Sequence, residues 1–227
     1  MGYDNIEYKA ELSHKEYRRD SYKILSECYY LPDKGLLDNL SSLDTKKGRV
    51  FSNLAKHRPG ISDIDSLTVD YSKLFVGPYE LLAPPYGSVY LEDKSRVMGN
   101  STVDVKKRYA EEGLDIGLKE APDHIAIELE FMYFLIFMEV EAIRISDSGT
   151  AASYQEKQRA FLETHLGMWV SEFADNVETN AQTTFYKSLA RITKSFIRRE
   201  LENLPLNSIS AKNRHRRDYV KGLSSSQ

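Results

Sequence analysis

The chain has 227 residues, of which 41% are hydrophobic and 29% charged, with a formal net charge of −3. These values indicate one large or two small globular domains with a buried core, and they give no sign of a nucleic-acid partner. Cys28 is the only cysteine, which excludes an internal disulfide or a thiolate metal cluster within the chain. We expect a cytoplasmic protein in which Cys28 is a buried small hydrophobe.

The first predicted helix runs from a cap at Ser13 to about Tyr30. The residues before it contain no apolar stretch of the kind that a secretory signal needs. The pair Arg18-Arg19 falls on the polar side of this helix, where we expect both side chains to be solvated. A turn at 31–35 separates this helix from two shorter ones, predicted at 36–43 and 46–57.

The segment 71–90 reads YSKLFVGPYELLAPPYGSVY and changes character halfway. Tyr71, Leu74 and Phe75 share one helical face, which ends a helix that starts near Ser62 or Asp63. Gly77 and the prolines that follow stop the helix and favour a loop at 77–90, with a brief extended stretch at 88–91. A loop so rich in apolar and aromatic residues is either packed down or built to bind.

The segment 120–125 reads EAPDHI and opens the most apolar run of the chain. We place Pro122 in the first turn of a long helix, where its missing N–H has no cost. The run 125–145 carries five charged residues, whereas a membrane span needs roughly 20 mostly uncharged ones. We therefore predict no stable membrane insertion, and a central helix at about 123–146 that is buried on most sides.

A helix from Ser101 or Thr102 to Gly113 precedes this central helix, and two more follow it. One lies within 150–178 with a weak point at Gly167, and the other spans 183–204. Trp169 falls on an apolar face and is expected in the core. The fold class is all-α, a multi-helix bundle around the central helix in a single domain at 1–206, with a polar, basic and loosely ordered tail at 207–227.

No catalytic signature is present: we find no phosphate-binding glycine loop, zincin pair or nucleophile elbow. No two of the five histidines lie four apart on a predicted helix, so we expect no metal site and no cofactor. Asp123 in a first helical turn complements the helix dipole without any function, and spacing alone favours that interpretation roughly threefold. His124 beside it is expected to be neutral, because the positive end of the dipole opposes the imidazolium.

The two segments together resemble the TorD/DmsD/NarJ family of redox-enzyme maturation chaperones, nearest the TorD/DmsD branch. Tyr86 stands where many members of that branch carry tryptophan. The matching residues are Leu74, Phe75, Gly77, Pro78, Pro84, Pro85, Tyr86, Gly87, Ser88, Val89 and Tyr90, then Glu120, Pro122, Asp123 and His124. Outside these segments the resemblance lies only in length and helical character.

The resemblance implies a cytoplasmic chaperone, not an enzyme, that binds the twin-arginine leader or the apo form of a molybdopterin-containing oxidoreductase. Such a chaperone delays export or assembly until the cofactor is inserted. Alternatives from the same resemblance are a NarJ-type assembly factor for a non-exported molybdoenzyme and a weak guanine-nucleotide-binding protein. It also implies homodimers, some formed by domain swapping, for which the 113–122 connection is a candidate hinge.

A leader presents paired arginines followed by an apolar segment, so its receptor needs carboxylates beside an apolar groove. Asp123, with Glu120 or Glu80, could meet the arginines. The resemblance implies a client-binding site made of Tyr71, Leu74, Phe75, Pro85, Tyr86, Ser88, Tyr90, Glu120, Asp123 and His124.

Overall fold

The structure is a computed structural model that describes residues 3–60, 63–77, 81–92, 99–114 and 120–203. Helices dominate these ranges, which contain no strand; the single β-type contact in them is an isolated antiparallel bridge between Tyr86 and His124. The predicted all-α class is therefore confirmed. In the described ranges, no helix combines the length and the apolar character needed to cross a membrane. The tail at 207–227 lies outside the described residues.

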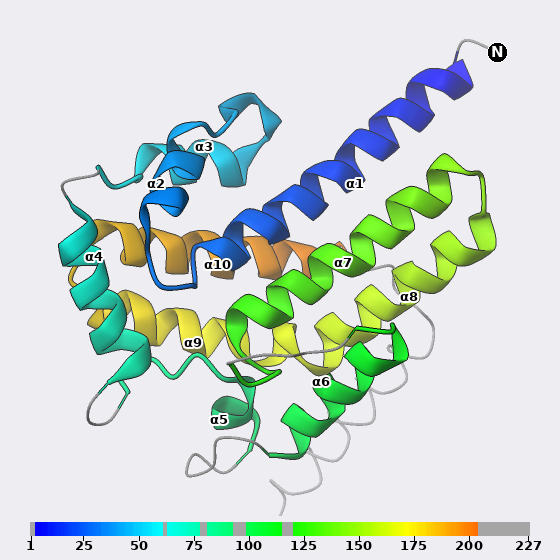
Figure 1. Ribbon diagram of the computed structural model, residues 1–227. Coiled ribbons are helices and arrows are strands. Elements are labelled where there is room, and N and C mark those ends of the chain that lie inside the picture. Colours follow the sequence, from blue (N-terminus) through cyan, green and yellow to red (C-terminus); the bar gives the residue numbers. More distant parts are fainter. Residues whose placement is uncertain (1–2, 61–62, 78–80, 93–98, 115–119, 204–227) are drawn as a thin grey trace, which may run out of the picture.

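Three long helices build one side of the molecule, and a pair of helices crosses beneath them (Figure 1). α1 (Tyr3–Glu27) and α7 (Ile125–Arg144) lie side by side in opposite directions, and α8 (Ser148–Thr164) returns along α7. α9 (Leu166–Asn180) and α10 (Thr184–Glu202) form the antiparallel pair. The shorter elements are α2 (Lys34–Ser41), η1 (Thr45–Lys47), α3 (Arg49–Lys56), α4 (Ile64–Tyr71), the π-helical turn η3 (Ser72–Val76), α5 (Gly87–Leu91) and α6 (Asn100–Glu111).

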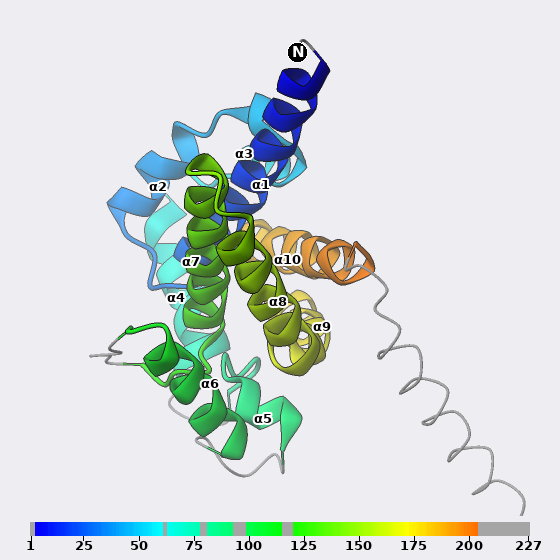
Figure 2. The same ribbon diagram turned by 90° about the vertical axis from the view of Figure 1, so that its right-hand side faces the viewer.

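α7 is the centre of the core, as predicted, with ends about two residues inside the expected range. Its buried side chains face every direction, because a helix that is apolar all round must be covered on all sides. α1, α8 and α9 pack against it. α5 and α6 gather near the N-terminal end of α7 in both views (Figures 1 and 2), which brings the two motif segments together.

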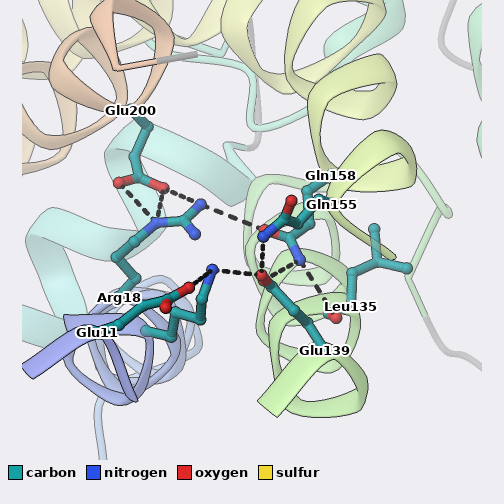
Figure 3. Close-up of polar contacts among 8 residues, drawn as sticks. Glu11, Arg18, Leu135, Glu139, Gln155, Gln158 and Glu200 are labelled. Carbon is teal, nitrogen blue, oxygen red and sulfur yellow. Dashed lines mark hydrogen bonds and ion pairs between the residues drawn. The ribbon is translucent and has the colours of Figure 1, made fainter. Parts of the chain in front are cut away.

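A buried network of charges fixes α1 against α7, α8 and α10 (Figure 3). Lys15 Nζ lies 2.6 Å from Glu139 Oε1, and Gln158 donates to Glu139 Oε2 at 2.8 Å. Arg18 Nε donates to both carboxylate oxygens of Glu200, at 2.9 and 3.1 Å. The prediction of a solvated Arg18 is wrong: its side chain is 17% exposed and serves as a structural ion-pair partner. Buried charges persist only when paired, so loss of either carboxylate would leave an uncompensated cation beside α1.

Three local predictions differ from the structure. The first helix begins at Tyr3, about ten residues before the expected cap, because residues 3–12 contain no glycine or proline that would stop it. The segment at 88–91 belongs to the short helix α5 and is not extended. The helix predicted within 150–178 is interrupted at His165; two residues on, a Cβ at Gly167 would collide with the Leu162 carbonyl oxygen.

Candidate functional site

The two motif segments join through three hydrogen bonds, each donated by a backbone N–H group. Ile125 N donates to Pro85 O at 2.8 Å, and Gly87 N donates to Asp123 O at 2.9 Å. Ser88 N donates to the Asp123 carboxylate, Oδ2, also at 2.8 Å. These bonds connect residues 35 to 40 positions apart in the sequence, so α5 and the start of α7 form one structural unit.

Asp123 is fully buried at the junction of the two segments. Its Oδ2 accepts from Ser88, while Oδ1 has no hydrogen-bond partner within the described residues. Asp123 and Pro122 precede α7 and are not in its first turn as predicted, because His124 takes the N-cap position. In this conformation Asp123 is not presented to solvent, and its direct contact with a partner's arginine stays a prediction.

His124 connects the cap of α7 to two tyrosine rings. Its Nδ1 accepts a hydrogen bond from Ala126 N at 3.2 Å. The imidazole centroid lies 5.4 Å from the Tyr86 ring, edge to face, and 6.3 Å from the stacked Tyr30 ring. Burial lowers the pKa of His124 to about 4, against a smaller opposing effect of the Asp123 charge. The predicted neutral histidine is confirmed, with desolvation as the main cause.

Tyrosines and carboxylates surround His124 on its outer side. Tyr86 Oη donates to Glu120 Oε2 at 3.3 Å, and Glu120 is exposed. Burial first, then the nearby charge of Glu120, raises the pKa of Tyr86 to about 12. Burial and then the Glu120 charge raise the pKa of Tyr71 to about 12. Burial, followed by the charges of Glu130 and Glu120, raises the pKa of Tyr30 to about 12. We call the set Tyr30, Tyr86, Glu120 and Glu130 the acidic aromatic surface.

The acidic aromatic surface is suited to a guanidinium group. Phenol rings attract a cation through their faces, and a carboxylate adds a charge-assisted hydrogen bond. The Glu130 side chain is 46% exposed and forms an ion pair with Lys23 at 2.9 Å, so part of its charge is already used. Glu120 has no cation partner among the described residues, which makes it the better acceptor for an incoming cation.

Sequence reasoning missed Tyr30 and Glu130. Glu130 had a usable signal, because it is one of two carboxylates near the start of the most apolar helix. Tyr30 had none, since it reaches His124 only through the packing of α1 on α7.

The other predicted site residues face the interior. Phe75 is 4% exposed, and its ring lies 5.1 Å from that of Tyr71 and 5.7 Å from that of Tyr186. Tyr90 stacks on Trp169 at 5.5 Å, on the α9 side of α5. Tyr71 itself is only 8% exposed. The remaining buried members of the predicted set are Leu74, Pro85 and Ser88, whereas Glu80 lies outside the described residues.

Beneath α5, a buried carboxyl group meets the chain's single tryptophan. Trp169 Nε1 donates to Glu128 Oε2 at 3.0 Å, and Glu128 Oε1 has no partner in the described part of the chain. Burial raises the pKa of Glu128 well above its usual range, so the group is held protonated. A Cβ on Gly87 would lie 2.9 Å from Trp169 Nε1 and 3.2 Å from Glu128 Oε1, so α5 fits here only with glycine. No group of His, Cys, Asp and Glu in the described ranges could hold a metal ion.

Comparison with known proteins gives a consistent set of relatives. The family model described as nitrate reductase delta subunit matches residues 41–175, a range that includes both motif segments. The chaperone protein TorD of Vibrio cholerae is 29% identical over 136 residues, covering 59% of this chain and 60% of that protein. The Tat proofreading chaperone DmsD of Salmonella paratyphi A is 28% identical over 132 residues, covering 57% and 58%.

A third relative, the perchlorate reductase assembly chaperone protein of Dechloromonas aromatica, is 30% identical over 142 residues, covering 60% of this chain and 62% of that protein. This chain thus spans about 60% of the length of the curated relatives it matches. Among solved structures, a protein of Archaeoglobus fulgidus assigned as a redox enzyme maturation protein is similar, with a TM-score of 0.55 and 26% identity. The match covers 79% of this chain and 93% of that one.

Proposed function

Because the chain belongs to the nitrate reductase delta subunit family, which is the TorD/DmsD/NarJ family of redox-enzyme maturation chaperones, we propose that it is a chaperone of a molybdopterin-containing oxidoreductase. It binds the twin-arginine leader of that enzyme's catalytic subunit in the cytoplasm. Binding delays export or assembly until the cofactor has been inserted. The chaperone itself holds no cofactor and catalyses no reaction.

The observation that carries the proposal is the contact between Tyr86 and Glu120 above the buried His124. The hydrogen bonds between the two motif segments support this contact from below, and the Glu120 carboxylate is exposed. A leader arginine placed against Glu120 gains a charge-assisted hydrogen bond, and the neighbouring phenol faces add cation–π attraction. We propose that Glu130 meets the second arginine in exchange for Lys23.

The apolar part of the leader needs exposed apolar surface beside the acidic aromatic surface. Leu31 follows Tyr30 directly and its side chain is 58% exposed. We propose that Leu31 and the Tyr86 ring meet the apolar segment of the leader. Leu74 and Phe75 then act from the core beneath, by keeping the wall of the site rigid.

Asp123 and Ser88 are positioning residues in this scheme. The Asp123 carboxylate accepts from Ser88 N in the first turn of α5, and the Asp123 carbonyl accepts from Gly87 N. These two bonds hold the chain just after Tyr86, and so help to keep the Tyr86 ring against His124. A change at Asp123 should therefore reduce leader binding and fold stability together. A change at the exposed Glu120 should reduce binding alone.

A second candidate function is assembly of the mature enzyme without use of the leader. The matching family and one relative favour it, since the family is described as a reductase subunit and the relative is an assembly chaperone for perchlorate reductase. Capture of the client from native extract separates the two candidates. Loss of capture when the client lacks its leader supports leader binding, whereas full capture supports the assembly role.

Calorimetric titration of the client's leader peptide into the folded chain tests the proposal. Each of Glu120→Gln and Glu130→Gln should weaken binding by about 0.2–1 kcal/mol, the usual value for an exposed ion pair, and the loss should shrink as salt rises. Tyr86→Ala should weaken binding with little salt dependence, because it removes apolar contact area. Glu202→Gln is the matched control, since Glu202 is an exposed carboxylate on α10. If all three site variants bind as tightly as this control, the leader binds elsewhere.

A further inference from the structure

A cavity of about 220 Å³ lies between α3 and α10, and the proposed function does not use it. Its apolar floor consists of Val50 and Ile192, which are 0% and 8% exposed. The polar side chains that line the rest are Asn53, His57, Ser188, Arg191, Ser195 and Arg199. None of the lining side chains is acidic, and every polar one can donate a hydrogen bond.

The two arginines of this cavity have unused donors. Arg191 pairs with Glu178 through Nε at 2.7 Å, and Arg199 donates from Nε to the Ser195 carbonyl at 3.2 Å. Within the described residues, the terminal nitrogens of both guanidinium groups have no partner. A guanidinium with free terminal nitrogens is well matched to a phosphate group, which it binds in a bidentate manner.

The spacing along α10 allows both arginines to reach one anion. Arg191, Ser195 and Arg199 are each four residues apart, so they follow one face of the helix over a rise of about 12 Å. An anion above Ser195 is therefore within the length of both arginine side chains. Ser188 stands one turn before Arg191 and is 6% exposed, which places a hydroxyl at the base of the cavity.

A second cavity, between α1, α8 and α10, contains cations whose charge is already neutralised by carboxylates. It is larger, about 450 Å³, and contains Lys15 and Arg18. Both of these cations are paired with buried carboxylates, those of Glu139 and Glu200. An anion gains little there, because the positive charge is already compensated. The cavity between α3 and α10 differs because no carboxylate lines it and because Arg199, unlike Arg191 with its partner Glu178, forms no ion pair within the described residues.

We propose that the cavity between α3 and α10 binds the phosphate group of a small phosphorylated ligand, seated between Arg191 and Arg199 above Ser195. The volume accommodates a phosphate with a small organic part. It falls below the 300–1,000 Å³ typical of sites for drug-sized ligands, which argues against a whole dinucleotide. The charged side chains of this site are basic, whereas those that define the acidic aromatic surface are carboxylates.

Binding of inorganic phosphate and of glycerol 3-phosphate to the full chain tests the proposal, in chloride buffer at constant ionic strength. Both a saturable rise in Tm and saturable amide shifts at Ser188 and Ser195 in NMR spectra are expected. Arg199→Gln and Arg191→Gln should each raise the Kd about tenfold or more, the usual effect of losing a charge-assisted hydrogen bond. Arg191 is 63% exposed, so its variant keeps the test valid even where Arg199→Gln folds poorly.

Arg198→Gln is the matched control, because Arg198 is the next residue on α10, is 70% exposed and pairs with Glu202. It removes the same charge outside the cavity and should leave the Kd unchanged. Tighter binding of glycerol 3-phosphate than of phosphate identifies a phosphorylated metabolite, and the reverse order identifies free phosphate as the ligand. An equal loss of binding in Arg198→Gln and Arg199→Gln, or no saturable binding of either probe, overturns the proposal.

Discussion

Replacement of Gly87 by alanine tests the packing that holds the candidate site. Helix propensity alone predicts a gain, since alanine is better than glycine in a helix by about 0.5–1 kcal/mol. The structure predicts a loss. The new Cβ would lie 2.9 Å from Trp169 Nε1 and 3.2 Å from Glu128 Oε1. Both of those side chains are buried, at 1% and 0% exposure, so neither can move away freely.

The expected loss follows from two contributions. Forcing a methyl group into a filled core costs about 1–3 kcal/mol. Displacing the indole would also break its 3.0 Å hydrogen bond to Glu128, which leaves a buried polar group unpaired. We therefore expect Gly87→Ala to lower the free energy of unfolding by about 1–3 kcal/mol. For a chain of this length that corresponds to a fall in Tm of about 2–12 °C.

Urea denaturation, monitored by tryptophan fluorescence, measures this effect. Trp169 is the chain's only tryptophan, and its ring contacts the substituted residue. Gly149→Ala is the control: Gly149 lies in the first turn of α8, and the nearest atom to its new Cβ would be Asp147 Oδ1 at 3.6 Å. That variant should be unchanged or slightly more stable. If Gly87→Ala is as stable as Gly149→Ala, the described contact of α5 with Trp169 and Glu128 is wrong.

Three further predictions concern pH and self-association. Glu128 keeps its proton in the folded state above its ordinary pKa of 4.5, so the parent should lose stability as pH rises from there. The Glu128→Gln side chain still accepts from Trp169 and has no proton to lose. In urea titrations its free energy of unfolding, relative to that of the parent, should therefore rise between pH 5 and pH 8. A difference in free energy that stays constant over this range would contradict the prediction. His124 has a folded pKa of about 4 against 6.5 when unfolded, so its contribution is complete above pH 6.5 and is lost as pH falls towards 4, by about 3 kcal/mol at most. His124→Asn, which keeps a capping side chain, should flatten the stability profile in that window, and an unchanged profile would exclude the buried neutral imidazole. We also expect a slowly exchanging dimer in light scattering at high concentration; a monomer at every concentration would count against self-association.

The periodicity of apolar residues predicted the central helix and the buried tryptophan correctly. The apolar run at 125–145 required a covered central helix, and the helical face containing Trp169 required a buried ring; both are found. The two motif segments were recognised together from their sequences, and the hydrogen bonds between them show that they are adjacent in the structure.

Features that depend on tertiary contacts were not predictable in the same way. α5 has five residues, too few for a periodic signal, and its first turn is held by Asp123 from another part of the chain. Tyr30 joins the candidate site only because α1 packs on α7. Arg18 has the same sequence pattern as a solvated residue, but Glu200 at the far end of the chain pairs with it.

A double-mutant cycle between Glu120 and the leader tests the central claim most directly. It combines the parent chain and Glu120→Gln with the parent leader peptide and a leader whose arginines are replaced by glutamine one at a time. Calorimetry gives the four binding free energies for each arginine. If Glu120 meets a leader arginine, the two changes should be non-additive by about 0.2–1 kcal/mol for one of the two arginines, and the coupling should fall as salt rises. Strict additivity for both arginines at low salt would contradict a leader-binding role for the acidic aromatic surface.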